Sequence, residues 1–184
     1  MKFRYLPNLI SFSRIIISPI FIYMMLKNTF YFKFFSMLIF FLGSLSDALD
    51  GYIARKFNIK TDLGKYIDPL ADKILIISGF CIFSYYYPHI IKVWMIVIIV
   101  LRDILTMTLR NFMINKNSVL ITSKFAKGKT FFQILVMHIL LLLHIYNPAY
   151  INNYNFSYFL MLLCVFFSIA STFHYIMINF LLKK

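Results

Sequence analysis

Long apolar runs separated by short polar connections dominate the pattern along this chain of 184 residues. A helix that crosses a membrane needs about 20 predominantly apolar residues. Six runs approach that length, and we expect each to form a transmembrane helix. They are Asn8–Leu26, Phe32–Leu49, Tyr66–Tyr86, Val93–Ile114, Phe125–Ile145 and Phe156–Leu182. The pattern therefore predicts an all-α integral membrane bundle of six transmembrane helices, forming a single domain over residues 1–184.

The composition agrees with a membrane protein. Hydrophobic residues make up 61% of the chain, whereas soluble domains carry about 45–50% apolar residues. The first apolar run is followed by no small-residue cleavage site, so we expect it to be retained. The net charge of +13 is typical of nucleic-acid-binding proteins. Here the bases flank apolar runs, which favours membrane topology and phosphate-bearing ligands, with no nucleic-acid partner.

Lysine and arginine side chains are distributed unevenly over the ends of these runs. Lys27, Lys33 and Lys92 lie at one set of ends. The bases at the other set are Lys2, Arg4, Arg55, Lys56, Lys60, Lys65, Lys116, Lys124, Lys183 and Lys184. Because cytoplasmic loops carry the excess of basic residues, we expect both termini to be cytoplasmic. We expect a multi-pass protein of the inner (cytoplasmic) membrane.

Five of the six acidic residues fall within one stretch, Ser46–Lys73. Asp47 and Asp50 are three residues apart at the end of a predicted helix, and this spacing places them on one helix face. Asp68 and Asp72 are four residues apart at the start of the next helix and share a face for the same reason. Two helices joined by a short loop can therefore present two carboxylate pairs to each other, at the cytoplasmic interface.

Four carboxylates in partly apolar surroundings need compensating charge. Oxygen-only ligands suit Mg²⁺, Mn²⁺ or Ca²⁺, and two such ions about 4 Å apart can hold a pyrophosphate during displacement at phosphorus. Gly51 would let a ligand approach the backbone, Ala54 is small, and Arg55 could bind a phosphate. Two alternatives remain open: ion pairs with neighbouring lysines, which we favour for Asp62, and an ion or proton pathway.

The same stretch resembles the signature of the CDP-alcohol phosphatidyltransferases, D-x2-D-G-x2-A-R-x8-G-x3-D-x3-D. Every fixed position is present at the right spacing. These positions are Asp47, Asp50, Gly51, Ala54, Arg55, Gly64, Asp68 and Asp72. The resemblance covers essentially the whole chain and implies a six-spanning membrane enzyme. In that family an alcohol attacks the β-phosphate of a CDP-lipid, and CMP is released.

The resemblance implies a role for each aspartate of the motif. Asp47, Asp50 and Asp68 would be the main ligands of two Mg²⁺ or Mn²⁺ ions, with Asp72 contributing. Asp72 would also be the general base that takes the proton from the acceptor hydroxyl. The residues implied to line the CDP-lipid site are Asn8, Gly51, Ala54, Arg55 and Gly64. For Asn8, capping of the first helix is an equally open interpretation.

Two further stretches are most similar to the phosphatidylglycerophosphate synthases, the members that use glycerol 3-phosphate. One is "LPNLISFSRIIISPIF", with Pro7, Asn8 and Arg14. The other is "LRDILTMTLRNFMINKNSVLITSKFAKGKTFFQ", in which Asp103 stands where glutamate is usual and Ala126 where glycine is usual. The implied substrates are CDP-diacylglycerol and glycerol 3-phosphate. Homodimers, a tendency of the family, are a possible assembly.

Glycerol 3-phosphate is a dianion and requires cations. We regard Arg110, Lys127 and Lys129 as candidates to bind its phosphate, with positive-inside anchoring as the alternative for each. Arg102 lies within an apolar run, and we interpret it as structural, facing the bundle with Asp103 or a ligand phosphate nearby. Other acceptors (serine, an inositol phosphate or phosphatidylglycerol) and, from another class, a divalent-cation carrier are the alternatives for function.

Overall fold

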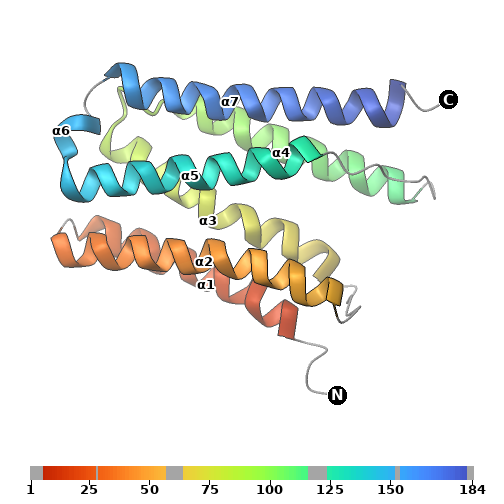
Figure 1. Cartoon of the computed structure of the whole chain (residues 1–184), viewed down its shortest axis with the longest axis horizontal. Coiled ribbons are helices and arrows are strands. Elements are labelled where there is room, and N and C mark those ends of the chain that lie inside the picture. Colours follow the sequence, from red (N-terminus) through yellow and green to blue (C-terminus); the bar gives the residue numbers. More distant parts are fainter. Residues whose placement is uncertain (1–5, 28, 57–63, 116–123, 152–153, 182–184) are drawn as a thin grey trace. The chain divides into compact units, whose positions relative to one another are not determined.

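The computed structural model describes the backbone of residues 6–27, 29–56, 64–115, 124–151 and 154–181. It describes the side chains of residues 12–27, 29–46, 71, 73–110, 112–113, 128–151 and 155–179. The helices are α1 (Leu6–Leu26), α2 (Phe30–Lys56), α3 (Gly64–Tyr86), α4 (Val93–Asn115), α5 (Lys124–Tyr146), the short α6 (Pro148–Ile151) and α7 (Tyr154–Ile176), which continues as a π-helix, η2 (Met177–Leu181). Figure 1 shows these helices in sequence colours. The described residues include helices and no strand, which confirms the all-α prediction.

The chain divides into two compact units. Unit 1 comprises Met1–Ile82 and Leu141–Pro148, and unit 2 comprises Phe83–Leu140 and Ala149–Lys184. Unit 1 therefore holds α1, α2, most of α3 and the end of α5. Unit 2 holds α4, most of α5, α6 and α7.

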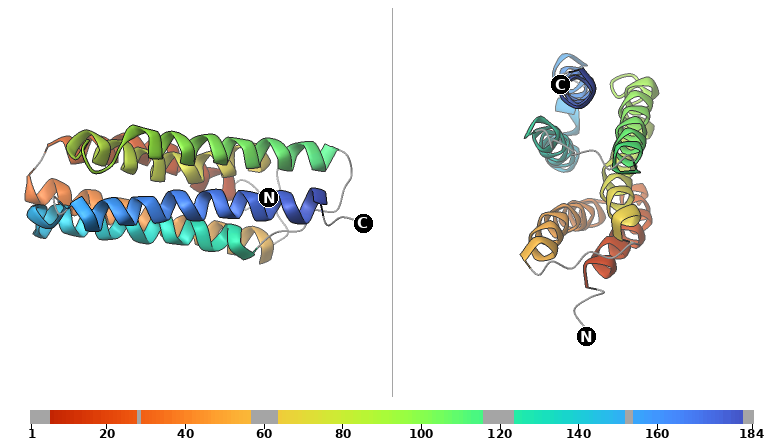
Figure 2. Two further views of the ribbon diagram at one scale, coloured as in Figure 1. Left: turned by 90° about the horizontal axis from the view of Figure 1, so that it is seen from above. Right: turned by 90° about the vertical axis from the view of Figure 1, so that its right-hand side faces the viewer.

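Within unit 1, α1 and α2 pack against each other as an antiparallel pair (Figure 1). The ring centroids of Phe21 and Phe40 lie 5.6 Å apart, and the Ser36 hydroxyl donates to Sδ of Met25 at 3.0 Å. All four side chains are buried. In the right-hand view of Figure 2, α2 lies on one side, and α1 and α3 overlap on the other.

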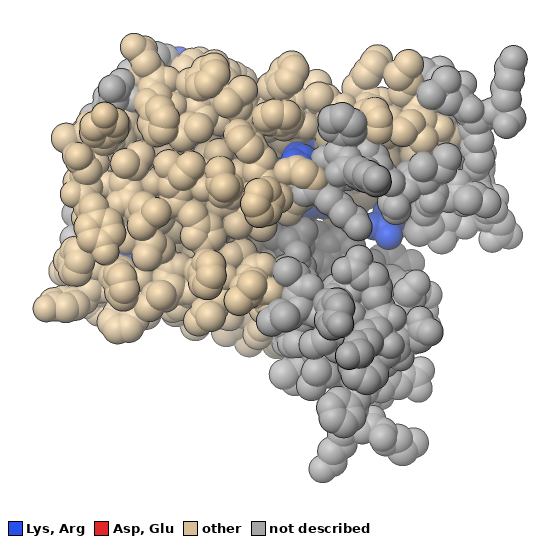
Figure 3. Space-filling model, in the orientation of Figure 1, with Lys and Arg blue, Asp and Glu red and all other residues tan. Residues whose placement is uncertain are grey.

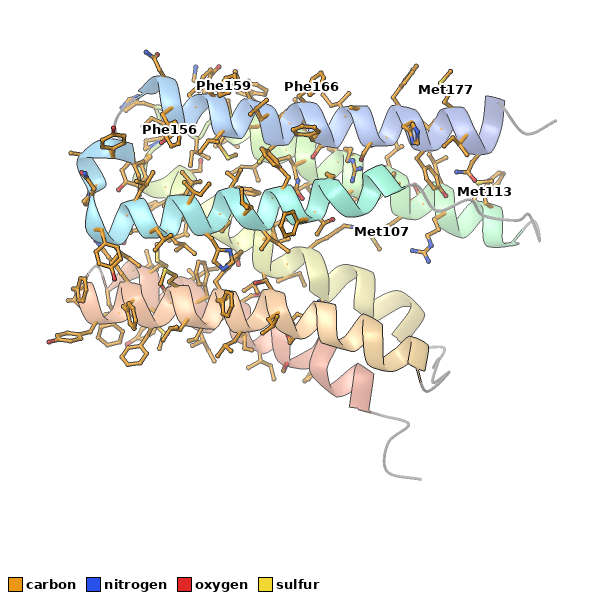
Figure 4. The ribbon with its side chains drawn as sticks, viewed as in Figure 1. Met107, Met113, Phe156, Phe159, Phe166 and Met177 are labelled. Atoms are coloured by element: carbon orange, nitrogen blue, oxygen red, sulfur yellow. The ribbon has the colours of Figure 1, made fainter. Side chains whose placement is uncertain are left out.

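Within unit 2, α7 packs against both α4 and α5. The rings of Phe132 on α5 and Phe167 on α7 lie 4.9 Å apart. Other large apolar side chains of α7 and η2 are exposed, among them Phe156, Phe159 and Phe166 of α7 and Met177 of η2, which are spaced along the helix in Figure 4. An apolar helix that buries one side and exposes aromatic rings on another is typical of contact with lipid.

Among the residues that the structure describes, two helical segments are long and apolar enough to cross a membrane, Gly128–Tyr146 and Asn155–Asn179. Shorter apolar segments occupy α1, α2 and α3 over Phe12–Leu26, Phe30–Ser46 and Lys73–Tyr86. On the face drawn in Figure 3, few of the described residues are lysine or arginine. These features support membrane association, whereas the number of spans and the cytoplasmic placement of the termini stay predictions.

Candidate active site

One stripe of α2 leads directly into the acidic motif. Ser36, Phe40 and Gly43 are buried and follow one another at spacings of four and three residues. The same alternation continues along the helix through Asp47, Asp50 and Ala54. Residues at these spacings lie on one face of a helix. By the register of the helical backbone, the motif positions of α2 therefore continue the same stripe.

Gly43 marks a close approach between α2 and α3. A Cβ atom added to Gly43 would lie 2.6 Å from Cδ2 of Leu75, so only a residue without a side chain fits there unless Leu75 moves. The two helices run in opposite directions (Figure 1). Asp47 follows Gly43 by one helical turn, and Asp72 precedes Leu75 by one turn. Both aspartates are therefore displaced to the same side of the contact.

The stripe of α3 that contains Leu75 also carries motif positions. Asp72, Asp68 and Gly64 precede Leu75 at spacings of three and four residues and share its face. The backbone thus gives α2 and α3 matching stripes that each carry two aspartates beyond the Gly43–Leu75 contact. The expected facing of two carboxylate pairs concerns side chains outside the described ones and stays a prediction.

Most side chains of the predicted site lie outside the described ones. These are Asn8 on α1; Asp47, Asp50, Gly51, Ala54 and Arg55 on α2; Gly64, Asp68 and Asp72 on α3; and Lys127 on α5. The described side chains include no group of three or more histidine, cysteine, aspartate or glutamate residues. Because the motif aspartates are not among them, the metal site stays a prediction. Asn8 falls inside the first turn of α1, which begins at Leu6, so its position does not support the capping interpretation.

Unit 2 contains a buried charged cluster of Arg102, Asp103 and Lys129. Oδ1 of Asp103 accepts hydrogen bonds from Nη1 of Arg102 and from Nζ of Lys129, the latter at 2.5 Å. The exposed fractions of the three side chains are 11%, 6% and 3%, respectively. Two cations and one carboxylate leave this cluster with a formal charge of +1. Of the two neighbours expected for Arg102, Asp103 or a ligand phosphate, the structure shows Asp103.

Polar groups of α7 and α5 complete this cluster. Nε of Arg102 donates to the carbonyl oxygen of Ser168 at 2.7 Å, and Nη2 of Arg102 donates to Oγ of Ser171. Nε2 of Gln133 donates to Oγ of Ser168 at 3.1 Å. The cluster therefore joins α4, α5 and α7 by hydrogen bonds between buried groups. The sequence alone did not reveal that Lys129 pairs with Asp103, because the two residues are 26 positions apart.

The described candidates for acceptor binding differ in environment. Arg110 is exposed on α4, two turns beyond Arg102. Lys129 is buried and shares Asp103 with Arg102. Its charge is therefore already partly neutralised within the protein.

Arg14 is a buried residue to which our sequence reasoning gave no separate role. It lies on α1 in unit 1 and is only 2% exposed. Its neighbours on the same stripe, Ser18, Phe21 and Met25, are buried as well. The spacing of four, three and four residues along this stripe was the signal that could have placed Arg14 in the interior.

The comparison with known families decides the assignment. The family model of the CDP-alcohol phosphatidyltransferases matches residues 4–170. The chain belongs to this family. The match spans both units and includes the whole acidic motif, so the resemblance predicted from the motif is confirmed. The protein is therefore an enzyme of the CDP-alcohol phosphatidyltransferase type.

Several curated relatives carry one name, CDP-diacylglycerol–glycerol-3-phosphate 3-phosphatidyltransferase. The relative from Wigglesworthia glossinidia brevipalpis is 36% identical over 141 residues, covering 74% of this chain and 76% of the relative. That from Bacillus subtilis (strain 168) is 30% identical over 182 residues, covering 92% of each chain. That from Rickettsia felis is 36% identical over 137 residues, covering 74% of this chain and 75% of the relative.

Proposed function

We propose that this protein transfers the phosphatidyl group of CDP-diacylglycerol to glycerol 3-phosphate, yielding phosphatidylglycerophosphate and CMP. The observation that carries the proposal is the complete motif on two helices in a chain that belongs to the family. The printed name of the relatives supports the choice of glycerol 3-phosphate as acceptor. Because the chain belongs to an enzyme family, the divalent-cation carrier has no further support.

The motif aspartates fit a divalent-metal site. The close approach at Gly43 supports two facing stripes that carry Asp47, Asp50, Asp68 and Asp72 beyond the contact. Carboxylate oxygens are the donors that Mg²⁺ and Mn²⁺ prefer. These four residues would hold two ions, which when bound would neutralise charge on the diphosphate of the CDP-lipid.

The transfer itself is a displacement at phosphorus. The acceptor hydroxyl oxygen forms a bond to the β-phosphorus of CDP-diacylglycerol, and the bond from that phosphorus to the oxygen bridging it to CMP breaks. Asp72 takes the proton of the hydroxyl, and CMP leaves with the bridging oxygen. A general base of this kind contributes about 10²–10⁴-fold to the rate.

The remaining motif positions would bind the CDP-lipid. Asn8, Gly51, Ala54, Arg55 and Gly64 are the residues proposed to line its nucleotide and phosphates. Small residues at three of these positions allow the ligand and the backbone to approach closely. The guanidinium of Arg55 suits bidentate hydrogen bonding to a phosphate.

For the acceptor phosphate, we propose Arg110 and Lys127 as the main cations. Arg110 is exposed, so its charge is available to a ligand. Lys129 is a weaker candidate because its Nζ is bound to Asp103. It would contribute through the net positive charge of its cluster.

The proposed setting is one domain of six transmembrane helices in the cytoplasmic membrane, with both termini and the active site on the cytoplasmic side. Lipid tails would enter from the bilayer, while CMP would leave to water. The protein would act alone or as a homodimer.

The test is CMP release by the purified protein in detergent, with CDP-diacylglycerol, Mg²⁺ and one acceptor at a time. We expect release with glycerol 3-phosphate and none with serine, an inositol phosphate or phosphatidylglycerol. Release with another acceptor only would refute the proposed substrate and retain the reaction class. Asp72→Asn should still bind CDP-diacylglycerol and lose turnover by about 10²-fold or more. The control Asp62→Asn, at a position that the motif leaves unspecified, should keep wild-type turnover.

A further inference from the structure

Arg14 is a buried cation on a helix that carries no acidic residue. Keeping a guanidinium charged within an apolar bundle requires a negative partner, since removing an ion from water without one is costly. The chain has six acidic residues. One of them, Asp103, pairs with Arg102 and Lys129 in unit 2. The other five belong to the stretch from Ser46 to Lys73, in unit 1 with Arg14.

The packing of α1 on α2 indicates which position lies opposite Arg14. Met25 contacts Ser36, and Phe21 contacts Phe40. A step of four residues toward the N-terminus of α1 therefore matches a step of four residues toward the C-terminus of α2. Arg14 lies seven residues before Phe21 on α1, and Asp47 lies seven residues after Phe40 on α2. Each step is two helical turns, or about 10.5 Å. A repeat of seven residues keeps the same faces of two packed helices in register. Arg14 and Asp47 therefore occupy the same level of the α1–α2 pair.

We infer that Arg14 is the fixed counter-charge of the aspartate site, placed at the level of Asp47 to offset carboxylate repulsion before metal binds. This inference rests on the proposed metal site and adds a positioning residue to it. A permanent cation at this level keeps the metal-free site from accumulating four uncompensated negative charges on two facing helices. It also makes the loaded site net positive, which favours a diphosphate ligand.

The experiment measures thermal unfolding in detergent with EDTA and with Mg²⁺, and Mn²⁺ binding by electron paramagnetic resonance without substrate. We expect Arg14→Met to unfold at least about 5 °C lower than wild type in EDTA, because it leaves buried carboxylates uncompensated. Mg²⁺ should restore most of that loss. Mn²⁺ should bind several-fold more tightly to Arg14→Met than to wild type, while Arg14→Lys should resemble wild type.

The matched control is Lys33→Met, which removes one half-buried positive charge from the same helix pair. Lys33 is 14 residues from Asp47 along α2, about 21 Å. It should change neither the EDTA sensitivity nor the Mn²⁺ affinity. Equal behaviour of Arg14→Met and Lys33→Met, or unchanged or weaker Mn²⁺ binding by Arg14→Met, would overturn the inference.

A double variant keeps the test decisive if Arg14→Met alone does not fold. Removing both charges should remove the imbalance, so Arg14→Met/Asp47→Asn should regain stability in EDTA relative to Arg14→Met. If the double variant were no more stable in EDTA than Arg14→Met, the pairing of Arg14 with the level of Asp47 would be refuted. Wild-type protein that binds no Mn²⁺ would instead refute the proposed metal site, so the two failures are distinguishable.

Discussion

At the scale of single residues, Asp103 is the group whose loss the structure makes most costly. It is the carboxylate that Arg102 and Lys129 share, and all three side chains are almost fully buried. Breaking a buried ion pair by removing one partner costs about 3–5 kcal/mol, because the remaining charge stays buried. We therefore expect Asp103→Asn to lower the thermal unfolding temperature strongly. The measurement is thermal unfolding of the purified protein in detergent.

Two controls separate charge from size at this position. Asp103→Glu keeps the carboxylate and should unfold close to the wild-type temperature. Arg110→Gln removes an exposed charge on the same helix and should change the unfolding free energy by no more than about 0.5 kcal/mol. An Asp103→Asn protein as stable as Arg110→Gln would show that the cluster is not a stabilising ion pair.

At the scale of helices, the contact between α2 and α3 governs the spacing of the two aspartate stripes. A branched side chain at Gly43 would overlap Leu75, because even a Cβ atom there lies 2.6 Å from Cδ2. We expect Gly43→Val to push the helices apart and lower CMP release by at least about tenfold, since a misplacement of 1 Å can cost about 10²-fold. Gly43→Val should therefore impair CMP release more strongly than it impairs thermal stability.

Gly128 supplies the matched control for Gly43. It also lies within a helix, and a Cβ atom added there would meet nothing within 4 Å. Gly128→Ala should keep or slightly raise stability, because alanine favours a helix by about 1 kcal/mol over glycine. If Gly43→Val retained wild-type turnover, the Gly43–Leu75 contact would not set the geometry of the site.

The helices show how far the hydrophobic pattern alone can predict structure. The predicted run Val93–Ile114 corresponds closely to α4 (Val93–Asn115). By contrast, the run Phe32–Leu49 stops seven residues before the end of α2, which continues to Lys56. Apolar content reports where a helix can contact lipid, whereas a helix continues for as long as its backbone hydrogen bonds do. The polar segment from Asp50 to Lys56 is therefore helical but lay outside the predicted run.

The site was predictable where its chemistry is local in sequence. The motif aspartates are linked by helical spacing, so their shared faces follow from the sequence alone. The pairing of Lys129 with Asp103 depends on a contact between helices distant in sequence. No spacing rule within one helix gives such contacts. They required the packed structure.

At the scale of the whole molecule, the charges within the helices bear on how many helices cross the membrane. In the described part of the chain, two segments meet the length and hydropathy of a span, while α4 carries Arg102, Asp103 and Arg110 within its apolar sequence. The Arg102–Asp103 pair is joined to Lys129 and to serines of α7, so its charges are satisfied inside unit 2. A helix whose charges are satisfied by neighbouring helices can still cross a bilayer. We therefore keep the prediction of six spans.

Cysteine labelling in intact cells tests this topology. In a background with Cys81 and Cys164 replaced by serine, we expect His89→Cys, in the turn between α3 and α4, to react with a membrane-impermeant maleimide from outside. His89 is exposed in that turn, and the basic ends of the predicted spans lie on the opposite side. A cysteine added after Lys184 should react only once the membrane is opened. Labelling of the added C-terminal cysteine in intact cells would refute cytoplasmic placement of that end, and with it a cytoplasmic site between α2 and α3.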